Sequence, residues 1–151
     1  MDRPDEQLIK AQCQELVLQF ALLNDTRQYE KLAELFAEDG VFYRPMQPEH
    51  GLKGRQQILE DLCRKPENLS SFHVCTNILI SVEGTTRASG ITYFTVYLGS
   101  TAAFGQAASV AFEGTVYVGQ YTDEFRRQGQ RWFIQSRRGK NNFHLKEQSH
   151  V

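Results

Sequence analysis

The apolar residues of this chain change their spacing at Pro66, and this change restricts the folds that the sequence can adopt. Before Pro66 they recur at helical intervals, as in the series Ile9, Cys13, Leu16, Val17 and Phe20. After Pro66 the chain consists of long strand-like runs separated by turn sequences. Helices that precede strands, instead of alternating with them, favour an α+β fold in which the helices pack on one face of a single antiparallel sheet.

Glycine, proline and turn residues mark the expected element boundaries. The first helix ends at Asn24-Asp25-Thr26, and a second helix, with an apolar stripe over residues 29–36, stops at Gly40. A short strand over residues 41–44 precedes a third helix that begins near Gly54. Long strands are expected at residues 73–82, 87–98, 114–127 and 131–139.

The connection over residues 99–113 is long for a compact domain. It is rich in Ser, Thr, Gly and Ala around Phe104 and Phe112. Connections of this kind are often functional or mobile. The sequence leaves three interpretations open: a flexible loop, an additional strand, or a lid over a pocket.

Length and charge limit the classes of function that the chain can serve. Its 151 residues are expected to form one domain over residues 1–139, followed by a polar tail over residues 140–151. A net charge of −1 argues against a general attraction to nucleic acid or membrane surfaces, and no apolar run is long enough to span a bilayer. Cys13, Cys63 and Cys75 have neither metal nor redox spacing, so they are interpreted as core residues of a reduced, cytoplasmic protein.

The strand that begins at His73 is apolar on both faces. Strict alternation places Cys75, Asn77 and Leu79 on one face and Val74, Thr76, Ile78 and Ile80 on the other. If helices cover only one of these faces, the other is expected to pack against a second subunit. The sequence therefore predicts a homo-oligomer, either a dimer or a trimer.

Asp25 and His73 are the residues best placed for chemistry, because a carboxylate that orients an imidazole makes a general base at neutral pH. Asp25 follows the first helix and His73 opens a strand, so the fold can bring them together. Structural interpretations also stay open. Asp25, with Gln28 three residues on, fits a helix N-cap, and a single histidine at a strand start is often a core residue. Of the neighbours Arg137 and Arg138, alternation directs only one toward the interior.

Two local motifs accompany this order of elements. Asp39-Gly40 leads into the first strand, and Tyr121-Thr122-Asp123-Glu124-Phe125 leads to Trp132 on a final hairpin. With these motifs the chain, from about residue 8 to residue 139, resembles the SnoaL-like branch of the nuclear transport factor-like superfamily. The resemblance implies a cone-shaped, cystatin-like fold, in which a curved antiparallel sheet wraps round N-terminal helices and encloses an apolar pocket.

Within that branch the sequence is similar to the scytalone dehydratases and the hexachlorocyclohexane dehydrochlorinases, which are cofactor-free lyases that use an Asp–His pair. The resemblance implies that Asp25 and His73 form this pair. It also implies that Arg137, five residues beyond Trp132, is a pocket arginine that stabilises developing negative charge. The implied apolar and aromatic lining of the pocket is Phe42, Phe94, Val96 and Tyr121.

Some positions depart from these relatives. Phe20 stands where the dehydrochlorinase has a pocket lysine, so the help available to an anionic leaving group is reduced. The strand over residues 91–98 contains no counterpart of the second histidine of the dehydratase. Tyr29 and Tyr43 are the nearest matches to the tyrosines that hold a water molecule in the dehydratase, and with Phe20 they are expected among the residues that contact the substrate. These departures affect the expected substrate more than the Asp–His pair.

The sequence thus predicts a lyase or isomerase, of the dehydratase or dehydrohalogenase type, that uses no cofactor or metal. Its expected substrate is a hydrophobic, cyclic small molecule, with Asp25 and His73 as the general base. Two alternatives stay open at this point. One is a non-catalytic domain that binds a small ligand, and the other is a structural subunit like the β subunit of ring-hydroxylating dioxygenases.

Overall fold

The structure, a computed structural model, describes residues 3–101, 109 and 111–146. Its helices precede the long strands, as the sequence predicts, so the α+β class is confirmed. The predicted lid or loop falls mostly on residues 102–108 and 110, which lie outside the described residues. The elements are α1 (Arg3–Asp25), α2 (Tyr29–Ala33), β1 (Phe36–Tyr43), β2 (Gly51–Lys53), α3 (Gly54–Leu62), β3 (Leu69–Val82), β4 (Arg87–Ser100), β5 (Gly114–Gln128) and β6 (Arg131–Lys146).

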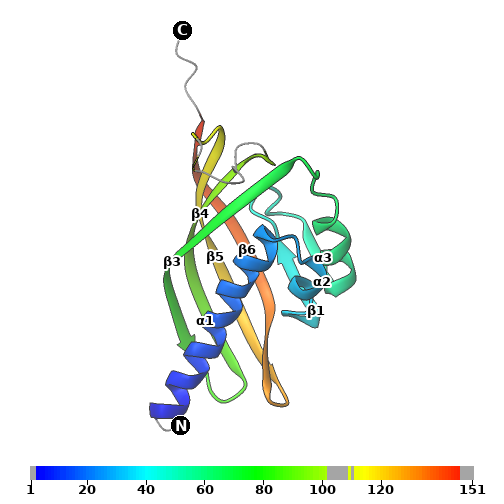
Figure 1. The fold of residues 1–151 in the computed structure, drawn as a ribbon. Coiled ribbons are helices and arrows are strands. Elements are labelled where there is room, and N and C mark those ends of the chain that lie inside the picture. The colour runs from blue at the N-terminus through cyan, green and yellow to red at the C-terminus, as the bar shows by residue number, and fades with distance from the viewer. Residues whose placement is uncertain (1–2, 102–108, 110, 147–151) are drawn as a thin grey trace.

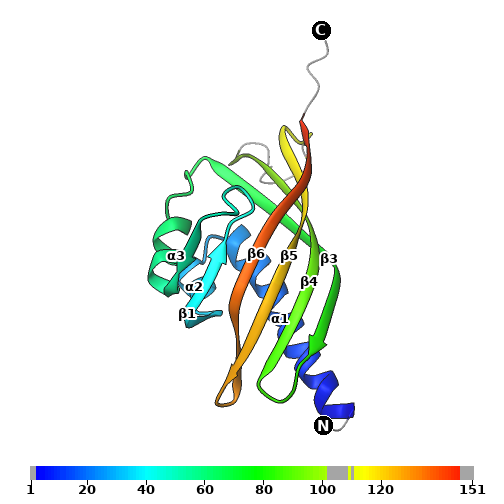
Figure 2. The same cartoon turned by 180° about the vertical axis from the view of Figure 1, so that it is seen from behind.

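The strands form a 6-stranded sheet in the order β2-β1-β6-β5-β4-β3. Neighbouring strands are antiparallel except β1 and β6, which run parallel. Helix α1 crosses the inner face of the long strands, while α2 and α3 stand beside β1 at one side of the sheet (Figure 1). Figure 2 looks onto the opposite face of the same strands, with α1 behind them. The sheet is curled and carries the helices on its inner side, which is the cone-shaped fold that the family resemblance implied.

A bulge in β3 changes which of its side chains face the helices. The pairing with β4 shifts between Thr76 and Leu79, and Asn77 has a φ of 50°, in the left-handed region that Asn tolerates. Beyond this point Ile78 and Ile80 pack against the core, whereas Leu79 is 68% exposed. The strict alternation predicted for this strand is therefore wrong from Asn77 onward, because one extra residue reverses the faces.

The second helix is shorter than the sequence predicts. α2 ends at Ala33 and β1 begins at Phe36, so Gly40 lies inside a strand and does not stop a helix. The backbone amide of Ile134 on β6 donates to the carbonyl oxygen of Leu35 at 2.8 Å, and Phe36 pairs with Ile134. Pairing with a distant strand has thus overridden the local helical spacing.

The last strand is longer than the sequence predicts. β6 continues past Gly139 to Lys146, so residues 140–146, predicted as a polar tail, pair with β5. This extension alternates polar residues with Phe143 and Leu145, and both of these apolar side chains are exposed. The short strand β2, which pairs with β1, was not predicted either.

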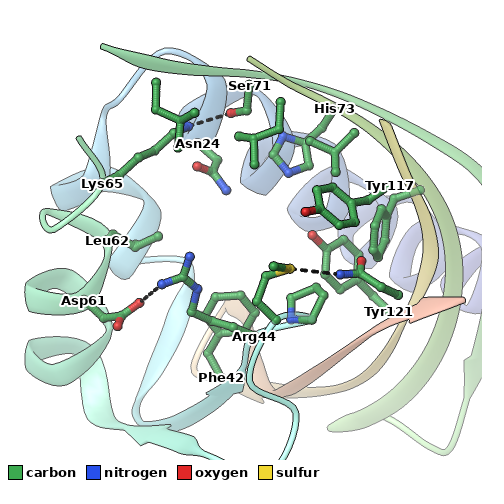
Figure 3. A pocket seen from close by; sticks show the side chains of 17 residues that line it. Asn24, Phe42, Arg44, Asp61, Leu62, Lys65, Ser71, His73, Tyr117 and Tyr121 are labelled. Carbon is green, nitrogen blue, oxygen red and sulfur yellow. Dashed lines mark hydrogen bonds and ion pairs between the residues drawn. The ribbon is translucent and has the colours of Figure 1, made fainter. Parts of the chain in front are cut away.

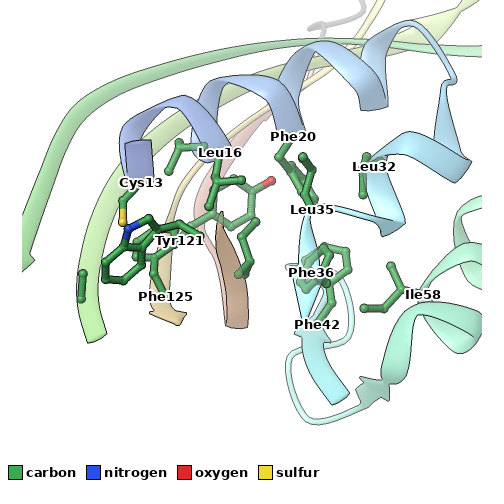
Figure 4. Packing of buried hydrophobic residues seen from close by; sticks show 14 of the residues in the cluster. Cys13, Leu16, Phe20, Leu32, Leu35, Phe36, Phe42, Ile58, Tyr121 and Phe125 are labelled. Carbon is green, nitrogen blue, oxygen red and sulfur yellow. The ribbon is translucent and has the colours of Figure 1, made fainter. Parts of the chain in front are cut away.

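The core lies between α1 and the inner face of the sheet (Figure 4). Phe20 is at its centre and meets three other rings in edge-to-face geometry. The ring centroids are 6.2 Å apart for Phe36, 5.4 Å for Phe42 and 5.9 Å for Tyr121. This aromatic cluster joins α1 to both β1 and β5.

Position 119 of β5 requires glycine, because the backbone of Lys140 and the ring of Phe94 both approach it closely. A Cβ atom at this position would lie 2.1 Å from the carbonyl oxygen of Lys140 and 2.6 Å from the ring of Phe94. The absent side chain lets Phe94 lie against β5, where its ring centroid is 4.6 Å from that of Tyr121. These two rings are thereby held at the base of the site described below.

The cysteines lie in three different environments. Cys13 is buried, Cys75 is half-buried and Cys63 is exposed, so the prediction of three core cysteines is wrong for Cys63. Burial, with a smaller contribution from Asp123, raises the pKa of the Cys13 thiol to about 12. Within the described ranges, no three His, Cys, Asp or Glu side chains gather as a metal site requires. In the same ranges, every helix is too short or too polar to cross a membrane.

Candidate active site

The carboxylate of Asp25 is held by three groups of β3. Asp25 is the last residue of α1, and its Oδ2 accepts a hydrogen bond from the backbone amide of His73 at 2.8 Å. Its Oδ1 accepts from the hydroxyl of Ser71 at 3.0 Å and lies 2.5 Å from Nδ1 of His73. The helix N-cap interpretation of Asp25 is wrong, because Gln28 occupies the N-cap position of α2. Asp25 instead joins the end of α1 to the start of β3.

His73 stands on β3 between Asp25 and a cavity. The side chain of His73 is 9% exposed and that of Asp25 is 15% exposed, so the pair is largely shielded from water. A carboxylate only accepts hydrogen bonds, so Nδ1 donates to it. In the neutral ring, Nε2 then carries the lone pair. This is the arrangement that a general base requires.

A cavity of about 140 Å³ opens beside His73 (Figure 3). This volume is close to the ~150 Å³ of an apolar cavity known to hold one benzene molecule, so it suits a single ring. Its wall is mainly apolar and includes Phe42, Leu62, Leu69, Phe94, Val96 and Leu98. Its polar lining residues are Asn24, Arg44, Asp61, Lys65, Ser71, His73, Tyr117, Tyr121 and Asn141.

Two cationic side chains, Arg44 and Lys65, reach this cavity. Nη1 of Arg44, which follows β1, donates to Asp61 of α3 at 2.8 Å. Nζ of Lys65 donates to the hydroxyl of Ser71 at 2.7 Å. Burial lowers the pKa of Lys65 to about 8, with smaller contributions from nearby guanidinium groups. Because Ser71 also donates to Asp25, hydrogen bonds connect Lys65 to the buried carboxylate.

Arg27 holds the segment that carries Lys65. Its guanidinium donates to the carbonyl oxygen of Lys65 at 3.3 Å and to those of Pro66 and Leu69. Its backbone has a φ of 57°, a left-handed conformation that costs a residue other than glycine about 1–2 kcal/mol. Arg27 lies two residues after Asp25, so a single turn positions both the carboxylate and the segment that leads into β3.

Arg137 does not line the cavity, contrary to the role that the family resemblance implied. Its guanidinium is wholly buried and donates from Nε and Nη2 to the two oxygens of Asp123, each at 2.8 Å. It also stacks on the rings of Phe20 and Tyr121, 4.3 and 4.2 Å from their centroids. Burial alone would lower the pKa of Arg137, but Asp123 outweighs burial and raises it. Asp123 therefore neutralises the charge of Arg137 in a buried ion pair behind Tyr121.

The pattern at positions 137 and 138 agrees with strand alternation. Arg138 is exposed, and its guanidinium lies 3.7 Å from the ring centroid of Tyr43. Three residues predicted to contact the substrate do not line the cavity: Tyr43 is stacked with Arg138, Tyr29 is buried in the core, and Phe20 packs on Arg137. The other four residues predicted for the pocket are among those that line it: Phe42, Phe94, Val96 and Tyr121.

Most of the polar residues that line the cavity were not predicted from the sequence. A usable signal existed for Ser71, which lies two residues before His73 on the same face of one strand. Tyr117 and Tyr121, four positions apart on β5, likewise share one face of a strand. No local pattern marked Arg44 or Lys65, since each stands beside a proline outside regular structure. Only the folded chain brings these two side chains to the cavity.

Known proteins share this fold. A family model described as a SnoaL-like domain matches residues 5–138. A candidate scytalone dehydratase from Novosphingobium aromaticivorans DSM 12444 matches with a TM-score of 0.81 and 17% identity, covering 99% of this chain and 95% of that chain. A type-3 hexachlorocyclohexane dehydrochlorinase from Novosphingobium barchaimii LL02 matches with a TM-score of 0.81 and 17% identity, covering 99% and 97%. A protein of unknown function with a cystatin-like fold, from Nostoc punctiforme PCC 73102, matches with a TM-score of 0.69 and 18% identity, covering 89% and 92%.

At these identities the likeness to solved structures establishes the fold and not the activity. No curated protein matches the sequence. The family match, however, spans nearly all of the helices and strands described above. The chain belongs to the family of SnoaL-like domains.

Proposed function

We propose that the protein is a cofactor-free lyase or isomerase, of the dehydratase or dehydrohalogenase type, in which Asp25 and His73 act as the general base. The observation that carries the proposal is the 2.5 Å contact between Oδ1 of Asp25 and Nδ1 of His73, at the wall of a cavity. Membership of the SnoaL-like family and the likeness in fold to a dehydrochlorinase support a reaction of this type.

In the proposed reaction, Nε2 of neutral His73 takes a proton from a carbon atom of the substrate. The electron pair of the broken C–H bond forms a C=C bond while a leaving group departs from the neighbouring carbon. Asp25 keeps the proton on Nδ1 and stabilises the imidazolium. The imidazolium then returns its proton to water, or to a departing hydroxide, which restores the neutral ring.

The expected substrate is a hydrophobic molecule with a single ring. Aromatic and aliphatic side chains supply most of the cavity wall, and its volume of about 140 Å³ is suited to one ring. Shielding of His73 and Asp25 from water strengthens the electrostatic interaction between them. An apolar ligand would exclude the remaining water from this pair.

The test is a screen of single-ring alcohols and alkyl halides for loss of water or of hydrogen halide, followed by mass spectrometry. Turnover by the wild type is expected to fall by about 10²–10⁴-fold in His73→Ala, which lacks the base. Asp25→Asn should also lose activity, because an amide does not stabilise the imidazolium. Ser81→Ala, an exposed change on the same strand, is the matched control and should retain activity.

Two outcomes would contradict the proposal. Turnover that survives in His73→Ala would remove His73 from the mechanism. Ligands that bind in the cavity without any turnover would instead favour the non-catalytic binding domain. Ligand binding is therefore measured in parallel by calorimetry, with the same compounds.

We further propose that the protein is a homo-oligomer that associates through the face of the sheet seen in Figure 2. Phe72 of β3 pairs with Tyr97 of β4, and Val116 of β5 pairs with Leu145 of β6, so apolar side chains extend across the long strands. Extended exposed apolar surfaces are characteristic of protein interfaces. The large exposed side chains on this face are Phe72, Val74, Leu79, Ile91, Tyr93, Tyr97, Phe143 and Leu145.

A further inference from the structure

The charged groups at the cavity wall do not balance. Arg44 is paired with Asp61, whose carboxylate also reaches the cavity. Among the described residues, Lys65 has no carboxylate within ion-pair distance, and its ammonium donates to the neutral hydroxyl of Ser71. An ammonium group has three hydrogens to donate, so this contact leaves two of them for other acceptors.

Asp25 does not compensate the charge of Lys65 by direct contact. Its two oxygens accept hydrogen bonds from the hydroxyl of Ser71 and the backbone amide of His73, and they lie against the His73 ring. Asp25 is also absent from the residues that line the cavity, so Ser71 stands between the carboxylate and the ammonium. The cavity thus presents an unpaired cation next to an apolar wall.

The side chains that surround Lys65 make this cationic region a distinct part of the cavity. In Figure 3, Lys65, Asn24 and Arg44 lie on one side of the opening, with His73, Tyr117 and Tyr121 across from them. Among the described residues, the Nε and Nη2 nitrogens of Arg44 have no hydrogen-bond partner. Arg44 can therefore keep its bond to Asp61 and still face an anion.

We infer that Lys65 binds an anionic group of the ligand, so that the ligand of this site is a single-ring compound bearing a carboxylate or a comparable anion. The ring would lie against Phe94 and Val96, and the anion would lie near Lys65 and Arg44. The inference deepens the proposed function and rests on it only in placing the substrate in the same cavity. Burial lowers the pKa of Lys65 to about 8 because it destabilises the charged ammonium group, and a bound anion would offset this destabilisation.

The experiment compares the affinities of benzoate and benzamide, which share a ring and nearly the same shape but differ in charge. Binding to the full chain is measured by calorimetry near neutral pH. The wild type should bind benzoate at least about tenfold more tightly than benzamide, because a hydrogen bond to a charged group contributes more than a neutral one. Lys65→Met should abolish this preference, and Lys65→Arg, which keeps the charge, should retain part of it.

Arg64→Met is the matched control, because it removes a neighbouring exposed cation that does not line this cavity. It should keep the wild-type preference for benzoate. Three results would overturn the inference: equal affinity of the wild type for both probes, a preference that persists in Lys65→Met, or no binding of benzoate. Circular dichroism establishes beforehand that each variant is folded.

Failure of this inference and failure of the proposed function are distinguishable, because the probes bind without reacting. Loss of the benzoate preference together with turnover that depends on His73 would leave the general base in place and point to an uncharged substrate. A benzoate preference that depends on Lys65, without turnover that depends on His73, would identify a binding site for aromatic anions with no catalysis.

Discussion

Nδ1 of His73 lies 2.5 Å from Oδ1 of Asp25, although 48 positions separate the two residues in the chain. The backbone amide of His73 donates to the second oxygen of the same carboxylate at 2.8 Å. Asp25 therefore orients both the ring and the strand that carries it. Contacts of this kind select one neutral tautomer of histidine.

We expect neutral His73 to carry its proton on Nδ1, and ¹⁵N NMR of the imidazole nitrogens measures this directly. In Asp25→Ala the acceptor is lost, so the proton should redistribute between the two ring nitrogens. Thr76→Ala, an exposed change on β3, should leave the tautomer unaltered. A wild-type neutral ring protonated on Nε2 would be incompatible with the base proposed for this site.

The Arg137–Asp123 pair is expected to be a major determinant of stability. Arg137→Leu leaves the buried carboxylate of Asp123 without a partner and should lower the free energy of unfolding by about 3–5 kcal/mol in urea titrations. Replacing both residues by leucine should recover part of this loss, because no charge is then left unpaired. Arg138→Leu, at the exposed neighbouring position, should cost no more than about 1 kcal/mol. Similar losses at positions 137 and 138 would contradict this account.

Arg27 is expected to stabilise the segment that leads into β3. Arg27→Met removes the hydrogen bonds to three carbonyl oxygens and should lower the free energy of unfolding by about 1–3 kcal/mol. It should also move the pKa of Lys65 toward its ordinary value, because Arg27 is one of the groups that lower it. Arg27→Gly loses the same bonds but relieves the left-handed backbone, so its loss should be smaller by about 1 kcal/mol. An Arg27→Met variant with a higher free energy of unfolding than Arg27→Gly would argue against backbone strain at this position.

Lys65 should make stability depend on pH. Its pKa in the folded protein is lowered to about 8 from the ordinary value of 10.5, chiefly by burial. Between these two values the unfolded chain binds more protons than the folded chain, so the free energy of unfolding rises with pH across this window. The charged and titratable groups around Lys65 come from α1 and its following turn, α3, the segment after β1, and β3, and they are Asp25, Arg27, Asp61, Arg44 and His73.

Lys65→Met removes this titration, so it should flatten the rise and should stabilise the protein most at neutral pH. Urea unfolding of the wild type and of Lys65→Met across the window compares the two slopes. Arg64→Met, which leaves the ammonium in place, should keep the wild-type slope. Parallel pH profiles of the wild type and Lys65→Met would show that the ammonium group is not desolvated.

The uncovered face of the sheet is expected to mediate self-association. Phe72→Lys and Tyr97→Lys place charges at a cross-strand pair of exposed aromatic residues, so they should shift the protein from a dimer or trimer to a monomer in sedimentation velocity runs. Leu8→Lys, a similar change at an exposed position of α1, should leave the assembly intact. A wild-type protein that sediments as a monomer at high concentration would contradict the proposed oligomer.

Several features of the site were accessible from the sequence because they depend on local order. Asp25 ends a helix whose apolar spacing is clear, and His73 belongs to a strand whose β-branched and apolar residues are clear. The resemblance to a known family added the idea that these positions meet. It also implied a pocket role for Arg137, which a neighbouring strand overrode by supplying Asp123 as a buried partner.

Other features had no local signal. The bulge at Asn77 reverses the faces of β3, and apolar spacing does not mark where a strand takes up an extra residue, although Asn tolerates the left-handed backbone there. The apolar residues around Phe36 suit a buried strand as well as one face of a helix. The pairing of β1 with β6 decides between the two. Periodicity alone does not report the partner of an element.

By itself, the sequence determined the fold class and the order of the elements, because hydrophobic spacing reflects the local geometry of helices and strands. It also determined which residue types were available for acid–base chemistry. Only the tertiary structure decided which side chains meet: Lys65 with Ser71 at the cavity, and Arg137 with Asp123 behind it. Lys65 lies outside regular structure, and Arg137 opposes Asp123 across the β5–β6 hairpin because the register shifts between Glu124 and Phe125. Strand pairing and close packing set this geometry, which no local pattern encodes.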